Sequence, residues 1–249
     1  MGGSKEARQG LDAEKLLAKY LSNNLEKFGE CLSKIGINFS PISVEEKPKG
    51  RIKCDIMIKG KDCSSLCISL KTVTDASFHQ LDRRWLKEWE SILNIPPNIS
   101  QIFQDAILRV AKNPKSHFIL PDQQKIIAEF IRSHLKQILN EIFKGNENDV
   151  RVLAIFQRKE GVICLFNMDD VISFFEKQQV SFSNKGIIKI GEFITLQRKG
   201  GNSFHIKKEK TDPDHPGNQL QFKFKPLEFS KRMREGLPKS LSSCCLKLS

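Results

Sequence analysis

The chain has 249 residues, and its 41 Lys and Arg against 29 Asp and Glu give a formal charge of +12 at pH 7. Hydrophobic residues make up 39%, which is ordinary for a globular protein and excludes a disordered polyelectrolyte. No apolar run approaches the roughly 18 residues of a membrane-spanning helix, so we expect no membrane partner. The cysteines are odd in number, 7, and scattered, which predicts no disulfide framework and a reducing, cytoplasmic setting.

The excess of positive charge lies mainly towards the end of the chain. Residues 185–249 contain 14 Lys and Arg against 6 Asp and Glu, so this segment supplies +8 of the +12. Such an excess favours a polyanionic partner, nucleic acid above all, because each phosphate contact releases counterions. The alternative interpretation of any single basic cluster is a solvated surface.

The first 80 residues change from a helical to a strand-like period. Leucines and Phe28 recur at three- and four-residue steps over 11–32, which predicts one amphipathic helix. A polar loop is expected over 42–50. Apolar and β-branched residues over 51–58 and 66–73, separated by Lys-Gly-Lys-Asp, predict a β-hairpin.

A helical period then returns and gives way to further strands. Asp82 is expected to cap a helix that runs to Leu93, and Pro121 to begin a long helix that runs to Phe143. Between them we expect a helix over 99–110. The remaining expectations are a second hairpin (150–156 and 161–166), a short helix (169–176), three strands (187–190, 192–197 and 220–224) and a polar loop (200–218). These elements predict one α/β domain over 1–230, followed by a basic tail over 231–249.

Chemistry is suggested by the first expected hairpin. Asp55 lies on its first strand, and Ser69 and Lys71 lie on its second, where alternation points both side chains the same way. A carboxylate beside a lysine suits metal-assisted phosphodiester hydrolysis, because the carboxylate binds a hard cation and the ammonium stabilises developing charge. On spacing alone, one Asp and one Lys in neighbouring strands are more often ordinary surface residues.

Two further stretches fit contact with DNA. Gln80, Arg83 and Arg84 follow the hairpin, where Arg suits guanine or phosphate and Gln suits base edges. The second stretch ends the expected strand at 192–197, and its candidate residues are Gln197, Arg198, Lys199 and Asn202. The alternative interpretation is a capped helix and a charged turn.

Taken together, these motifs resemble a known enzyme family. The segments at 53–55, 69–71, 78–86, 194–201 and 220–223 are similar, in this order, to those of the HinP-type restriction endonucleases. These are type II enzymes that cut GCGC, belong to the PD-(D/E)xK nuclease superfamily and are related in fold to MspI. The likeness extends from about Ala13 to about Pro226.

The resemblance implies a restriction-endonuclease-like mixed β-sheet flanked by helices and Mg2+-dependent cleavage that leaves 5′-phosphates. It implies that Asp55 binds the metal and that Lys71 is catalytic. Ser69 occupies the position of an acidic residue or Gln, which makes it a weaker, auxiliary ligand. The Leu70 carbonyl is a further possible ligand, and Glu14 is a supporting carboxylate. Gln80 and Arg83 match a Gln and a Lys of the family's recognition loop, with Arg in place of Lys.

The sequence thus predicts a type II restriction endonuclease that acts on double-stranded DNA at a short GC-rich palindrome, with Mg2+ as cofactor. A cognate DNA methyltransferase is expected in the same system without a stable complex, and the enzyme is expected to be a monomer or a homodimer. Two alternatives remain open. One is a non-specific or nicking and repair nuclease of the same fold, and the other is a degenerate module that binds DNA without cutting it.

Overall fold

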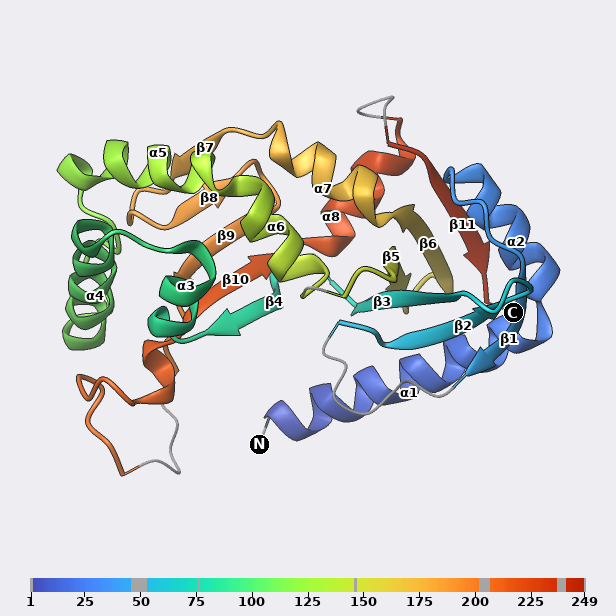
Figure 1. The fold of residues 1–249 in the computed structure, drawn as a ribbon. Helices are drawn as coiled ribbons and strands as arrows, with labels where there is room; N and C mark the ends of the chain where they lie inside the picture. The colour runs from blue at the N-terminus through green and yellow to red at the C-terminus, as the bar shows by residue number, and fades with distance from the viewer. Residues whose placement is uncertain are drawn as a thin grey trace. The chain divides into compact units, whose positions relative to one another are not determined.

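Two β-sheets, each with its own helices, organise the chain in a computed structural model (Figure 1). The structure describes residues 2–45, 53–75, 77–145, 147–201, 207–236 and 241–248. Each sheet belongs to a separate compact unit, and each unit is assembled from several segments of the chain. Unit 1 comprises residues 1–77, 143–174 and 226–249, and unit 2 comprises residues 78–142 and 175–225.

The sheet of unit 1 has the strand order β1-β2-β3-β5-β6-β11. Its strands are β1 (Pro41–Glu45), β2 (Ile56–Gly60), β3 (Ser65–Val73), β5 (Val150–Gln157), β6 (Val162–Asn167) and β11 (Ser243–Lys247). The central strands β3 and β5 run parallel, and the other neighbours are antiparallel. β5 is almost continuously apolar, as a strand buried on both faces should be.

Helices cover both faces of this sheet. They are α1 (Gly2–Asn23), α2 (Leu25–Lys34), α7 (Met168–Glu176) and α8 (Pro226–Arg234). Leu17 of α1 and Phe28 of α2 share a buried cluster with Leu165 of β6. The next residue, Phe166, alternates to the other face and packs against Phe229 of α8, with ring centroids 5.4 Å apart. The sheet of unit 1 is therefore the middle layer of three.

The sheet of unit 2 is antiparallel, with the order β4-β10-β9-β8-β7. Its strands are β4 (His79–Arg84), β7 (Val180–Phe182), β8 (Ile188–Ile190), β9 (Ile194–Arg198) and β10 (Leu220–Phe224). The helical elements are α3 (Leu86–Leu93), α4 (Pro97–Lys112), α5 (Gln124–Ser133), α6 (Leu135–Phe143) and the short turns η1 (Pro121–Gln123) and η2 (Pro216–Asn218).

One face of this second sheet packs against the helices of unit 2. Side chains of α3 to α6 meet Leu196 of β9 and Phe222 of β10, and Trp89 stacks edge-on against Phe222 with centroids 5.3 Å apart. The alternate residues of the same strands point to the opposite face and are mainly polar. The alternation of apolar and polar residues along 220–224 therefore separates a core face from a polar face.

Three expected helices differ from the structure. The helix over 11–32 is broken at Asn24, whose backbone is not helical (φ −138°). Asp82 does not begin a helix but lies in β4, so α3 starts only at Leu86. Its first turn is capped instead by Glu88, whose carboxylate accepts from the Trp85 N–H at 2.7 Å. The long helix to Phe143 is likewise divided, between Ser133 and Leu135.

The strands follow the sequence-based expectation more closely, with four additions, β1, β4, β7 and β11. The strands at 66–73, 150–156, 161–166 and 220–224 are confirmed within a residue or so. Part of the loop expected over 42–50 belongs to β1, whereas 46–50 and the start of the expected strand at 51–58 lie outside the described residues. β7 was not expected, and neither was β11, which pairs with β6 and brings part of the basic C-terminal segment into the sheet.

The expectation that the cysteines are unpaired was wrong for six of the seven. The structure contains the disulfides Cys31–Cys244, Cys54–Cys67 and Cys164–Cys245, and Cys63 is the free cysteine among the described residues. All six paired cysteines lie in unit 1, and the pairs join segments that the fold brings together. A separate finding is that the described residues include no helix long and apolar enough to cross a membrane.

Candidate active site and nucleic-acid interface

Asp55 immediately precedes β2, at the point where this strand leaves β3. The last paired residues of the two strands are Ile56 and Ile68, and the Asp55 N–H donates to the Ile68 carbonyl at 2.9 Å. Beyond this point β3 continues without β2 beside it. The Asp55 carboxylate takes the place of the missing strand and accepts from the Leu70 N–H, with Oδ2 2.6 Å from the nitrogen. Asp55 is therefore fixed at an open edge of the central strand.

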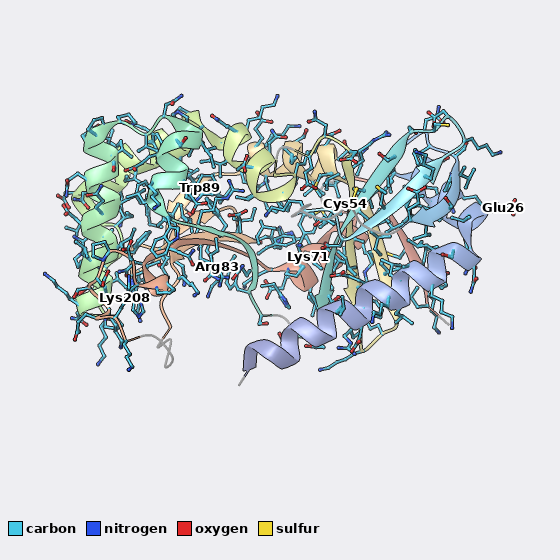
Figure 2. The ribbon with its side chains drawn as sticks, turned by 60° about the horizontal axis from the view of Figure 1, so that its bottom comes forward. Glu26, Cys54, Lys71, Arg83, Trp89 and Lys208 are labelled. Carbon is cyan, nitrogen blue, oxygen red and sulfur yellow. A yellow bond between two sulfur atoms is a disulfide. The ribbon has the colours of Figure 1, made fainter. Side chains whose placement is uncertain are left out.

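Ser69 and Lys71 flank this contact on β3. Lys71 Nζ donates to Ser69 Oγ at 3.3 Å, and the alternation of the strand places both side chains on one face, as expected. Ser69 is buried, with 2% of its surface exposed, whereas Asp55 and Lys71 are half-buried. Figure 2 shows the Lys71 side chain on this strand. The structure thus brings together Asp55, Ser69 and Lys71.

The backbone adds an oxygen to this cluster. In a β-strand the N–H and C=O of one residue point to the same side, so the Leu70 carbonyl faces the edge at which Asp55 binds the Leu70 N–H. A carboxylate with a carbonyl is a donor set that suits a hard divalent cation, which completes its shell with water and substrate oxygens. Among the described residues, no three His, Cys, Asp or Glu side chains cluster as a metal site, so this pair is the fitting candidate.

Glu14 comes from a different layer of unit 1. It lies on α1 next to Ala13, which is buried with Leu70 in the cluster beneath the sheet. Leu70 and Ser69 point to opposite faces of β3. Glu14 therefore belongs to the helical layer on the Leu70 face, and its role as a supporting carboxylate stays a prediction.

A disulfide lies directly beside Asp55. Cys54 precedes Asp55 in the chain, and it is bonded to Cys67 of β3, two residues before Ser69. Both cysteines are fully buried. The covalent link fixes the segment that carries the carboxylate to the strand that carries the lysine.

The DNA-contact candidates lie in unit 2. The register places Arg83 of β4, Gln221 of β10 and Gln197 of β9 in one transverse row. A second row holds Gln80, Lys223, Thr195 and Lys189. The three residues of the first row and the four of the second together form what we call the polar face of unit 2. None of the seven is acidic. Gln80 and Arg83 are exposed, and Figure 2 shows Arg83.

Lys199 continues this surface beyond the end of β9. Its pKa is lowered from its ordinary value, first by partial burial and second by the positive charge of Arg83. The positive charges of Lys199 and Arg83 are therefore close enough to repel one another. A bound phosphate would relieve this repulsion, because it favours the charged form of the lysine.

Arg84 is placed differently from Arg83. Its Nη1 lies 2.5 Å from Glu141 Oε1 of α6, its Nε lies 3.2 Å from Asp82 Oδ1, and its guanidinium stands 5.2 Å from the Trp89 ring centroid. Asp82 and Glu141 are both buried. These contacts join β4, α3 and α6, so the structure gives Arg84 a positioning role within the fold, and direct DNA contact by Arg84 stays a prediction.

This buried network predicts a stability effect. We expect Glu141→Gln to lower the free energy of unfolding by about 3 kcal/mol, because Arg84 would lose one of its two carboxylates in a buried setting. Urea unfolding followed by circular dichroism measures this change. The matched control is Glu129→Gln on the exposed side of α5, which should leave stability within about 0.5 kcal/mol of the parent. Equal stability of both variants would show that the network contributes little.

Arg198 is also buried, with 7% of its surface exposed. Its Nε donates to Asn218 Oδ1 of η2 at 2.8 Å, and its burial lowers the pKa of the guanidinium. A Cβ at Gly217 would lie 2.9 Å from His215 Nδ1 and 3.1 Å from Arg198 Nη2, so the turn packs closely over the guanidinium. Arg198 therefore holds the segment that follows β9, and contact with DNA would be indirect in this conformation. Asn202 lies outside the described residues.

Several residues of these sites were not anticipated. Gln221, Lys223 and Lys189 share the polar face, and the strict alternation of 220–224 was the signal that could have identified the first two. Arg84 is bound by Glu141, and Arg198 is bound by Asn218. No pattern local to either arginine could have identified these partners.

Comparison with known proteins places this arrangement in a family. Among solved structures, the restriction endonuclease MspI in complex with its cognate DNA is similar, with 16% identity, a TM-score of 0.48, and coverage of 83% of this chain and 82% of that chain. A search of the curated proteins gives no match. The model of a family described as R.HinP1I restriction endonuclease matches residues 49–230, which is well over half of the chain. The chain belongs to the R.HinP1I restriction endonuclease family.

Proposed function

We propose that this restriction endonuclease makes Mg2+-dependent double-strand cuts at a short GC-rich palindrome, GCGC, and leaves 5′-phosphate ends. One observation carries the proposal above all others. Asp55, the Leu70 backbone and Lys71 converge at the open edge of β3, with contacts of 2.6 Å from Asp55 to Leu70 and 3.3 Å from Lys71 to Ser69. The choice of GCGC rests on the resemblance of the separated motifs to the HinP-type enzymes.

The metal would be held by oxygen atoms of this edge. Asp55 supplies a charged ligand and Leu70 a carbonyl, while Ser69 is an auxiliary neutral ligand. When bound, Mg2+ neutralises charge on the scissile phosphate and makes a coordinated water more acidic. Asp55 is pre-oriented for this task because the Leu70 N–H already fixes one of its two oxygens.

Lys71 acts on the other participants of the reaction. Its ammonium has three donors, and one of them is directed at Ser69, which sets the direction of the side chain. The remaining donors orient the attacking water and stabilise the charge that grows on the phosphate oxygens. The water oxygen forms the new bond to phosphorus, the bond to the 3′ oxygen breaks, and that oxygen takes up a proton. The products are a 5′-phosphate and a 3′-hydroxyl.

Recognition falls to the polar face of unit 2 and to Lys199. Gln80 and Gln197 provide amides for base edges, while Arg83 and Lys199 provide charge for phosphate or guanine. Arg84 and Arg198 support these residues from within the fold. The substrate is double-stranded DNA, either in a complex with one protomer or with a homodimer, and a separate DNA methyltransferase would protect the host sites.

The decisive test is digestion of DNA of known sequence, unmethylated and methylated, with and without Mg2+, followed by mapping of the ends. We expect discrete fragments with 5′-phosphates from unmethylated GCGC sites, and none without a divalent metal. A smear would support a non-specific nuclease instead. Cleavage at another sequence would overturn GCGC and keep the enzyme class.

A second candidate function is a module that binds DNA and no longer cuts it. Ser69 favours this alternative, because it stands in place of an acidic or Gln ligand and its hydroxyl is already engaged by Lys71. Specific DNA binding together with an absence of cleavage at every Mg2+ or Mn2+ concentration would establish it.

Ser69 also offers a test of the metal site itself. We expect Ser69→Glu to lower the Mg2+ concentration for half-maximal cleavage by about tenfold, because a second carboxylate strengthens binding of a hard cation. Initial cleavage rates measured across a range of Mg2+ concentrations give this value. Ser69→Ala is the matched control, since it removes the hydroxyl and adds no charge. An unchanged Mg2+ dependence in Ser69→Glu would show that this position does not face the metal.

A further inference from the structure

Gln221 occupies the centre of the polar face of unit 2. It stands between Arg83 on β4 and Gln197 on β9, and it is the most buried member of its row, with 7% of its surface exposed. Its side-chain Nε2 donates to Oε1 of Gln80 at 3.1 Å. A partly buried amide pair of this kind holds both groups in a defined orientation, because water competes poorly for the bond.

The direction of this hydrogen bond determines what Gln80 offers to a ligand. A glutamine amide has an acceptor oxygen at one end and two N–H donors at the other. Because Oε1 of Gln80 is turned towards Gln221, its Nε2 is turned away from it. Gln80 is exposed, so these donors are the groups presented at the surface. An amide without such a neighbour could rotate and present either end.

We propose that Gln221 is a specificity-determining positioning residue, which fixes Gln80 as a hydrogen-bond donor towards an acceptor base edge such as guanine O6. This inference rests on the proposed function insofar as DNA is the ligand. Adenine carries a donor, the N6 amino group, where guanine carries O6. A donor at Gln80 therefore favours guanine over adenine at the position it contacts.

The proposal predicts different changes in base preference for two substitutions of Gln221. Gln221→Glu replaces the donor by a carboxylate that only accepts, so Gln80 must turn its Nε2 inward and its Oε1 outward. The preference at one base position should then move from guanine towards adenine by at least about tenfold in the ratio of kcat/KM values. Gln221→Met removes the hydrogen bond while keeping a side chain of similar size. It should bring the kcat/KM values for guanine and adenine closer together without reversing the preference.

The measurement uses a set of duplexes in which each G·C pair of the cleaved site is replaced in turn by A·T. Gln219→Glu is the matched control, because it introduces the same charge two residues away and should leave every ratio unchanged. Thermal denaturation establishes that each variant is folded. If Gln221→Glu does not fold, Gln221→Met carries the test, since loss of the hydrogen bond to Gln80 should reduce the preference for guanine at one position.

The outcomes separate this proposal from the proposed function. If the parent chain cuts at a defined site and neither Gln221→Glu nor Gln221→Met alters discrimination at any base, the role of Gln221 is wrong and the function stands. If the parent chain binds DNA without cutting it, the same ratios are measured as equilibrium binding by fluorescence anisotropy. A shift at a single position supports the proposal, whereas uniform weakening at all positions contradicts it.

Discussion

Asp55→Asn is expected to lower kcat for DNA cleavage by about 10³-fold or more, because loss of the charged ligand removes several kcal/mol of metal-dependent stabilisation. The substitution is nearly isosteric, and the amide oxygen of asparagine can still accept from the Leu70 N–H, which now lies 2.6 Å from the carboxylate. The fold at the edge of β3 should therefore persist. Single-turnover cleavage of a duplex that contains one site measures the change.

The control for Asp55 is a carboxylate of the same hairpin. Asp62→Asn affects an exposed residue whose carboxylate accepts hydrogen bonds from Ser64 in the turn between β2 and β3. Its cleavage rate should stay within about twofold of the parent, as surface substitutions seldom alter the fold. If both variants lose cleavage to a similar extent, the loss in Asp55→Asn comes from damage to the fold. If Asp55→Asn cleaves at nearly the parental rate, Asp55 is not an active-site residue.

Lys71→Ala should abolish detectable cleavage, with a loss of about 10²- to 10⁴-fold, and leave sequence-specific binding nearly intact. The reason is that the proposed mechanism has Lys71 act on the water and on developing charge, and assigns recognition to residues of unit 2. Binding is measured by anisotropy without divalent metal, and cleavage with Mg2+. Equal cleavage by the parent and by Lys71→Ala would overturn the catalytic assignment.

Two further variants separate charge from position at Lys71. Lys59→Ala removes a half-buried lysine from the neighbouring strand β2 and should cleave at nearly the parental rate. Lys71→Arg keeps the charge but changes the shape of the donor, and we expect partial activity between those of the alanine variant and the parent. An arginine variant as inactive as Lys71→Ala would show that the compact ammonium is required.

The catalytic edge could be foreseen because its determinants are local. The hairpin that contains Asp55 and Lys71 is short, and its apolar pattern defines both strands. Alternation then places Ser69 beside Lys71, as the 3.3 Å contact shows. The resemblance in the separated motifs added an expectation of which residue has which role, which spacing alone could not provide.

Other features depended on contacts between distant segments. Asp82 has the chemistry of a helix cap, but β10 pairs with β4 from 140 residues further on and draws Asp82 into a strand opposite Phe222. The cysteine pairs likewise reflect neighbours in space, and Cys31 meets Cys244 across a separation of 213 residues. Neither pairing has a signal in the local sequence.

Positive charge was the least reliable guide to individual contacts. Arg83 and Arg84 are adjacent in sequence, yet alternation exposes the first and directs the second to Glu141. Arg198 follows Gln197 in the same manner and is occupied by Asn218. Arg84 and Arg198 are thus held within the fold, next to the candidate contacts Arg83 and Gln197. A count of basic residues therefore overstates the number that can touch a ligand.

The interleaving of the two units constrains how this enzyme could acquire a new specificity. The chain passes between them four times, after residues 77, 142, 174 and 225, and all the recognition candidates in the described residues fall in 78–142 and 175–225. A single contiguous exchange with a relative that carries both recognition segments also replaces residues 143–174 of unit 1, which contain β5, the strand paired with β3. Chimaeras would need two coordinated insertions into one catalytic scaffold, and gradual substitution on the polar face is the simpler route to new target sites.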